Sequence, residues 1–313
     1  MSRKIRVSTL GGENLSTSYE EGMEKAVVKM IQYWEGRLSR ILHDKPDLIV
    51  LPECCDRYVN FTTKELLDYY DYRENRMLEY FSSVAKENSC YIAYSAVMPD
   101  KDGKNRNAIM MIDRHGKVMG RYNKHNLTIY EMEEIEGLCG KDAVIFDCDF
   151  GRVGAVICFD FNFDEIRNLY KEKKPNLMIF SSYYHGGFMQ NFWAYELRSW
   201  LVTSIGCNNL SAVINLVGAK IAETSNYRNW LTQEINLDCF VAHLDYNWDK
   251  VEKAKNQYGA GLQIYEPGQL GAMLLSSDMN DVTIDEIATE FEIEHIDEYF
   301  ARSIKAANEN REP

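Results

Sequence analysis

The sequence has little of several features that would assign a protein to a class at once. No stretch approaches the ~18 consecutive apolar residues that a transmembrane helix needs, and only 6 of the 313 residues are proline. The eight cysteines include no Cys-x-x-Cys pair, and no histidine stands at the spacing of a zinc site. These absences argue against a helical membrane protein, a proline-rich disordered chain and a structural zinc site, and we expect neither a metal nor a cofactor.

Positive charge is also in short supply. Lys and Arg number 35 against 48 Asp and Glu, which gives a formal net charge of −13. A chain with this balance is a poor match for nucleic acid or an anionic membrane surface. The scattered cysteines are typical of a reducing compartment, and we expect a cytoplasmic protein that acts on a small molecule.

Apolar strands alternate along the chain with amphipathic helices, and two hairpins interrupt the alternation. This order predicts an α/β fold with mixed rather than purely parallel sheets. No linker or repeat precedes residue 278, so residues 1–277 are expected to form one domain. The predicted strands cover 5–10, 47–51, 91–97, 108–112 with 117–119, 143–146 with 153–157, 176–182, 211–217 and 239–244, and the predicted helices 23–41, 64–88, 162–173 and 191–206.

The last segment, residues 278–313, differs in composition from the rest. Between residues 278 and 298 there are nine acidic residues and no Lys or Arg, yet apolar residues recur among them. The pattern indicates an ordered extension with a solvated acidic face. We expect it to pack on the domain or on a neighbouring subunit.

Three polar residues stand where apolar runs end. Glu53 follows a buried strand across a proline, Lys124 follows the second strand of a hairpin, and Cys158 closes the run from Val153 to Ile157. Open α/β sheets bind ligands at the carboxyl ends of their strands, so these side chains could converge in one crevice. Taken singly, each also has a plain structural explanation: a packed thiol, a loop carboxylate and a solvated amine.

The segments around these residues resemble signature blocks of a known family. DLIVLPE at 47–53, RYNK at 121–124 and GRVGAVICFD at 151–160 are similar to those of the nitrilase (carbon–nitrogen hydrolase) superfamily, in the same Glu, Lys, Cys order. Asn107 and the segment 163–167 resemble further family positions. The resemblance covers roughly residues 4–220 and implies an amidase-like member with a four-layer α-β-β-α sandwich of two mixed sheets.

The resemblance also implies a division of roles for a thioester mechanism. Cys158 would be the nucleophile and Glu53 the general base that takes its proton and later activates water. Lys124 and the backbone N–H of Phe159 would stabilise the negative oxygen of the tetrahedral intermediate.

A second glutamate of the family, which orients the lysine and the substrate amide, would be Glu133, with Glu134 as the alternative. For substrate contacts, the family places pocket residues in the loop that holds Tyr183, Tyr184 and His185, of which Tyr184 is the best candidate. The other interpretation is that the two tyrosines only close the apolar edge of a sheet.

The sequence therefore favours a cysteine-dependent hydrolase of a small non-peptide C–N bond, in a linear amide or an N-carbamoyl compound. Two alternatives stay open: an acyltransferase on the same scaffold, and a binding protein with a silent site. By the same resemblance we expect a homodimer or a larger homo-oligomer.

Overall fold

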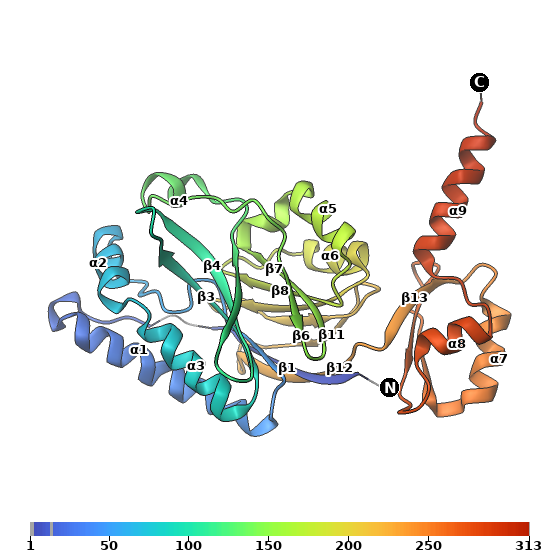
Figure 1. The fold of residues 1–313 in the computed structure, drawn as a ribbon, viewed down its shortest axis with the longest axis horizontal. Helices are drawn as coiled ribbons and strands as arrows, with labels where there is room; N and C mark the ends of the chain where they lie inside the picture. The colour runs from blue at the N-terminus through green and yellow to red at the C-terminus, as the bar shows by residue number, and fades with distance from the viewer. Residues whose placement is uncertain (1–2, 13–14, 313) are drawn as a thin grey trace.

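The computed structural model describes residues 3–12 and 15–312, and in these residues two large mixed β-sheets pack face to face with helices on their outer faces (Figure 1). The short strand β2 (Leu48–Val50) shows why the central strands of this arrangement are apolar. Leu48 and Val50 face the second sheet, whereas Ile49 and Leu51 face the outer helices. Because side chains alternate along a strand and both faces are covered, the run is apolar throughout. The predicted α/β class and four-layer order are confirmed.

The first sheet contains β2 near its centre and has the strand order β12-β1-β2-β3-β4-β5. The pairs β1–β2 and β2–β3 are parallel, whereas β12, β4 and β5 run antiparallel to their neighbours. The other strands are β1 (Lys4–Leu10), β3 (Tyr91–Pro99), β4 (Asn105–Ile112), β5 (Val118–Asn123) and β12 (Trp230–Asn236).

The second sheet repeats this plan with the order β11-β10-β9-β8-β7-β6. Its central strands β7, β8 and β9 are parallel and its flanking pairs antiparallel. The strands are β6 (Ile145–Cys148), β7 (Gly151–Ile157), β8 (Leu177–Ser182), β9 (Trp200–Ile205), β10 (Ala212–Ile214) and β11 (Lys220–Glu223).

Helices cover the outer face of each sheet. On the first sheet, buried side chains of the outer helices, such as Trp34 and Phe81, form one apolar cluster with the strands. On the second sheet, Tyr170 and Trp193 join the cluster that also fills the space between the sheets. The helices of these two layers are α1 (Met23–Leu38), α2 (Thr63–Arg73) and α3 (Arg76–Asn88) on the first sheet, and α5 (Asp164–Lys173) and α6 (Met189–Leu197) on the second.

The predicted helix over 191–206 is wrong in its second half. Helix α6 ends at Leu197, Arg198 adopts a left-handed φ of 49°, and Trp200–Ile205 form strand β9 between β8 and β10. All six residues of β9 are buried. A short run that is buried on every side gives no periodicity that separates a buried strand from a buried helix.

The structure also differs from the sequence prediction at one helix and one strand. The single helix predicted over 64–88 is divided into α2 and α3 at Glu74, whose φ is 46°. Strand β12 was not predicted, although it pairs with β1 along its whole length and completes the first sheet.

The chain after β12 builds a small unit that packs on the main core through Val241, Ala272 and Leu274. Strands β13 (Cys239–His243), β14 (Leu262–Tyr265) and β15 (Ala272–Ser277) form a third sheet in the order β13-β15-β14. This sheet shares an apolar cluster with α7 (Trp248–Tyr258) and α8 (Ile284–Glu290). The expected boundary between residues 277 and 278 falls inside this unit, because α8 packs on the same core as the strands.

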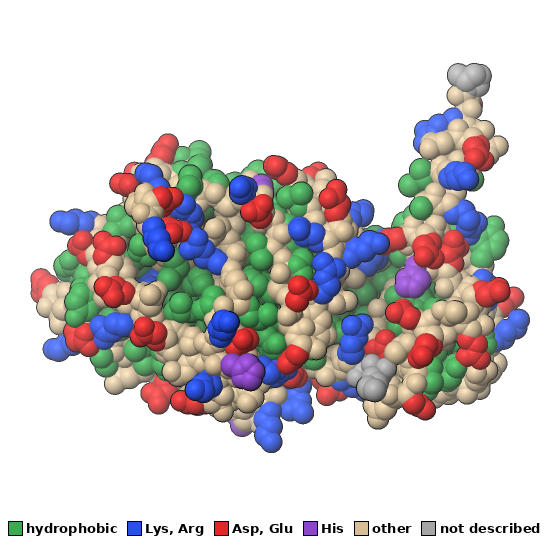
Figure 2. Space-filling model, in the orientation of Figure 1, with side chains coloured by type: hydrophobic (Ala, Val, Ile, Leu, Met, Phe, Trp, Pro, Cys, Tyr) green, Lys and Arg blue, Asp and Glu red, His purple; other side chains and the backbone are tan. Residues whose placement is uncertain are grey.

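The final helix, α9 (Ile296–Glu309), projects away from the rest of the molecule (Figures 1 and 2). Only Ile296 of this helix is buried. Figure 2 also shows that acidic and basic side chains are interspersed on this face of the molecule. No helix in the described ranges combines the length and the apolar character that a bilayer crossing requires.

Candidate active site

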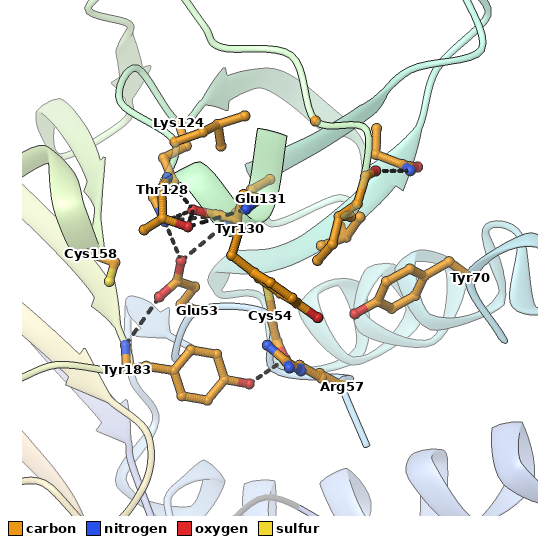
Figure 3. Close-up of a pocket in the computed structure, with 16 residues that line it drawn as sticks. Glu53, Cys54, Arg57, Tyr70, Lys124, Thr128, Tyr130, Glu131, Cys158 and Tyr183 are labelled. Carbon is orange, nitrogen blue, oxygen red and sulfur yellow. Dashed lines mark hydrogen bonds and ion pairs between the residues drawn. The ribbon is translucent and has the colours of Figure 1, made fainter. Parts of the chain in front are cut away.

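The residues at the three strand ends meet around one cavity (Figure 3). Glu53 lies in the turn after β2, Lys124 follows β5, and Cys158 follows β7. Two of these strands belong to the first sheet and one to the second, so both sheets contribute residues to the cavity wall. Its volume is about 170 Å³, which is small beside the roughly 300–1,000 Å³ of pockets for drug-sized ligands.

Glu53 and Lys124 form a buried ion pair. The Lys124 ammonium donates to Glu53 Oε1 over 2.9 Å, and the two side chains are 1% and 4% exposed. Asn107, from β4, donates its amide N–H to the same carboxylate oxygen over 2.8 Å. The backbone N–H of Tyr183 donates to the other oxygen over 3.1 Å. These contacts fix the orientation of the Glu53 carboxylate toward the cavity.

The second glutamate at Lys124 is Glu131, which corrects the expectation of Glu133 or Glu134. Glu131 accepts from the Lys124 ammonium over 2.8 Å and from the Asn107 amide over 2.7 Å. Glu131 belongs to the short helix α4 (Ile129–Glu133) and is partly buried. Glu133, at the end of the same helix, and Glu134, which follows it, are exposed to solvent.

Local sequence explains why Glu131 takes this place. Thr128 is the N-cap of α4, and its backbone N–H and hydroxyl both donate to Glu131 Oε2, over 2.8 and 3.0 Å. This capping box folds the carboxylate back over the start of the helix, toward Lys124. The Thr-x-x-Glu spacing at 128–131 is a sequence signal that could have identified Glu131.

The two carboxylates set the ionisation of the site. Burial alone would lower the pKa of Lys124, but the charges of Glu53 and Glu131 outweigh it and raise that pKa. Burial would raise the pKa of Glu131, and Lys124 together with Asn107 lowers it. Lys124 therefore stays protonated and Glu131 ionised at neutral pH.

Cys158 lies on a sharp turn between β7 and the 3₁₀ helix η3 (Cys158–Asn162). Its φ of 46° is in the left-handed region, which non-glycine residues rarely adopt. Buried Asp160 supports the turn by accepting hydrogen bonds from the Ile157 N–H (3.0 Å), the Tyr122 hydroxyl (2.6 Å) and the Asn126 N–H (2.7 Å). Asp160 thus links the cysteine turn to the segment around Lys124, a role that the sequence did not indicate. Phe159 follows Cys158 in η3, so its backbone N–H belongs to the same turn.

The Cys158 thiol is neutral in the free protein. Burial and the Glu53 carboxylate raise its pKa to about 12, against the lowering influence of Lys124 and Ser182. A thiol with this pKa is protonated at neutral pH, so a nucleophilic attack requires a base that accepts the proton as the bond forms. Glu53 is the carboxylate placed to do this.

The loop residues predicted as substrate contacts lie in different surroundings. Tyr183 lines the cavity together with the catalytic candidates. Tyr184 packs its ring edge against Phe180, and burial raises its pKa to about 12. His185 accepts a hydrogen bond from the Gly187 N–H at Nδ1. In the described part of the chain the cavity wall includes Tyr183 but neither Tyr184 nor His185. Residues 3–12 and 15–312 contain no cluster of His, Cys, Asp and Glu side chains that could hold a metal ion.

Comparison with known proteins identifies the family. The family model described as carbon–nitrogen hydrolase matches residues 16–209. The chain belongs to the carbon–nitrogen hydrolase family. The match spans β2, β5 and β7, and therefore includes Glu53, Lys124, Glu131 and Cys158.

The sequence identity to individual relatives is low. The chain is similar to the omega-amidase NIT2 of Bos taurus, with 27% identity over 185 residues, which cover 56% of this chain and 60% of that relative. The chain thus spans less than two thirds of the length of this curated relative.

Solved structures share the fold. A carbon–nitrogen hydrolase from Helicobacter pylori G27 superposes with a TM-score of 0.63 at 16% identity, covering 82% of this chain and 93% of that one. A mutant of the amidase from Nesterenkonia sp. AN1 superposes with a TM-score of 0.61 at 13% identity, covering 81% and 96%. In that amidase mutant the acetamide moiety of fluoroacetamide is covalently added at the active site cysteine.

Proposed function

We propose that the protein is an amidase that uses Cys158 to hydrolyse a small non-peptide C–N bond, in a linear amide or an N-carbamoyl compound. The observation that carries the proposal is the convergence of Cys158, Glu53 and Lys124 on one small cavity. Membership of the carbon–nitrogen hydrolase family and similarity to an omega-amidase support the reaction class.

The first half-reaction forms a thioester. Glu53 takes the thiol proton as Cys158 Sγ bonds to the amide carbon, and the electron pair of the C=O bond moves to oxygen. The charge of Lys124 and the N–H of Phe159 stabilise this oxygen. Glu53 then gives its proton to the nitrogen, so that ammonia or an amine leaves as the C–N bond breaks.

The second half-reaction restores the enzyme. Glu53 deprotonates a water molecule, which attacks the thioester carbon. The carbon–sulfur bond breaks and the thiolate recovers the proton, releasing a carboxylic acid. Glu131 contributes by holding Lys124 in place, since its carboxylate contacts the ammonium through both oxygens.

The direct test is ammonia release from a panel of small linear amides and carbamoyl compounds, with Cys158→Ala as the matched variant. The proposal predicts turnover that the variant loses. Activity that survives in Cys158→Ala would overturn the cysteine mechanism.

Two other functions share this scaffold and give different results in the same assay. An acyltransferase would consume the amide but give much more hydroxamate when hydroxylamine is added than acid in its absence. A silent binding protein would release no ammonia from any compound, and Cys158 would fail to react with iodoacetamide even at alkaline pH.

A further inference from the structure

The cavity holds a second cation besides Lys124. Arg57 lies in the loop that begins with Glu53, and its half-buried side chain lines the cavity. The loop is anchored: the Arg57 N–H donates to the Cys54 carbonyl over 2.9 Å, and the Cys55 N–H donates to the Ser95 carbonyl over 2.9 Å. Neighbouring Asp56 is fully buried and pairs with Arg73 over 2.7 Å. The backbone that carries the Arg57 side chain is therefore anchored on both sides of the turn.

The two cations differ in how their charges are balanced. Lys124 is shared by Glu53 and Glu131, both within 3.0 Å. Arg57, in the described part of the chain, forms no ion pair with a carboxylate, and the ionisable groups that surround it are phenols and a thiol. A half-buried cation without an acidic partner favours an anion.

The groups around Arg57 are suited to an anion. Its guanidinium lies 5.9 Å from the ring centre of Tyr183, and the hydroxyl ends of Tyr70, Tyr130 and Tyr183 converge on the same part of the cavity (Figure 3). The Tyr183 hydroxyl donates to the Cys54 carbonyl over 3.3 Å and the Tyr130 hydroxyl pairs with Thr63 over 2.7 Å. The guanidinium is therefore the group suited to the anion, since its N–H groups match the two oxygens of a carboxylate.

We propose that Arg57 binds a carboxylate at the far end of the substrate, so that the preferred substrate is a short acyclic amide carrying a negative charge. The inference rests on the proposed function, because the amide end is assigned to Cys158. A cavity of about 170 Å³ whose wall includes both a nucleophile and a guanidinium fits a short chain with an amide at one end and a carboxylate at the other.

The test compares glutaramate with glutardiamide, which has nearly the same shape and no charge. We expect the wild type to have a kcat/KM for glutaramate at least 10-fold above that for glutardiamide. Arg57→Gln should raise the KM for glutaramate about 10- to 100-fold, the usual loss for a hydrogen bond to a charged group, with kcat little changed. The variant should lose much less on glutardiamide, because the far amide of that substrate is uncharged and forms weaker hydrogen bonds with the guanidinium.

Controls separate this subsite from a general loss of charge or stability. Lys64→Gln removes an exposed positive charge of α2 outside the cavity wall and should leave both substrates unaffected. Arg57→Lys should recover part of the glutaramate preference. An equal loss on both substrates in Arg57→Gln, or a wild type without preference, would overturn the proposal.

Equilibrium binding keeps the two proposals distinguishable. Titration of Cys158→Ala with glutaramate measures the Arg57 subsite without turnover. Binding that is lost in Cys158→Ala/Arg57→Gln supports the subsite even if no amide is hydrolysed, in which case the proposed function alone fails. Binding that is equal in both proteins overturns the subsite even if amides are hydrolysed.

Discussion

At the scale of single residues, Glu53 governs the site through its contacts. Its carboxylate receives hydrogen bonds from Lys124, Asn107 and the Tyr183 backbone, and its charge helps to raise the pKa of Cys158. The same group therefore makes the resting thiol less acidic and offers the base that activates it. These two effects can be separated by experiment.

Glu53→Gln should affect hydrolysis and thiol reactivity in opposite directions. Loss of the general base should lower amide turnover by about 10²–10⁴-fold. Loss of the negative charge should bring the pKa of Cys158 below about 12, so that iodoacetamide alkylation begins at lower pH than in the wild type. Rates of alkylation against pH, with Cys158→Ala as the blank, measure the shift. A midpoint that stays in place or moves upward would contradict this account of the electrostatics.

The identity of the second glutamate can be tested with a matched pair of substitutions. Glu131→Gln removes a charged partner of Lys124, and we expect kcat/KM to fall about 10- to 100-fold. Glu133→Gln alters an exposed side chain two residues away and should leave kcat/KM within about twofold. The reverse order of effects would restore the sequence-based assignment of Glu133.

At the scale of structural elements, helices α2, α4 and α8 begin with the same Thr-x-x-Glu motif, and α2 and α4 both contribute to the cavity wall. Thr128 and Glu131 form a capping box at α4, and Thr62 and Glu65 form one at α2. Only the first has its glutamate in contact with Lys124. Comparing the caps of α4 and α2 therefore separates the contribution of a cap to protein stability from its effect on the active site.

Thr128→Ala and Thr62→Ala should each lower the free energy of unfolding by about 1 kcal/mol, the usual cost of losing an N-cap. We expect Thr128→Ala also to lower kcat/KM, because Glu131 loses the hydroxyl hydrogen bond that helps to aim its carboxylate at Lys124. Urea denaturation and steady-state kinetics check both effects. Equal kinetics in the two variants would show that the cap does not position Glu131.

Sequence reasoning succeeded where one element determines the outcome. The apolar run before Glu53 predicted a strand buried on both faces, and the run before Cys158 predicted β7. It failed where tertiary contacts decide, as at β9, whose burial hides its periodicity, and at β12, which is defined by pairing with β1 far away in the sequence. Arg57 was missed because its surroundings come from α2, α4 and the loop after β8, which no local pattern brings together.

At the scale of the whole molecule, the C-terminal unit lies outside the wall of the active-site cavity. The cavity is lined by residues at strand ends of both large sheets and by α2 and α4. Residues 239–293 form a third sheet with an apolar cluster of its own, and β13 and β15 also contact the main core through Val241, Ala272 and Leu274. Helix α9 extends beyond both, with Ile304 60% exposed. This arrangement is compatible with the expected role of the extension as a contact between subunits, which remains a prediction.

A chain that ends at Glu298 would test this role. We expect the full chain to be a homodimer or larger. The truncated chain should have fewer subunits per particle by light scattering, because most of α9 is missing. Amide hydrolysis per subunit should stay within a few-fold, since α9 contributes nothing to the cavity wall. An equal number of subunits per particle for the two chains would exclude α9 as the subunit contact.

The central claim is that Cys158 carries the acyl group during turnover. Mass spectrometry of the intact protein, quenched in acid during hydrolysis of an amide that it turns over, measures this directly. The account predicts an added mass equal to the acyl group, located on the peptide containing Cys158 and absent from Cys158→Ala. Amide turnover with no adduct on that peptide, and with activity retained in Cys158→Ala, would contradict it.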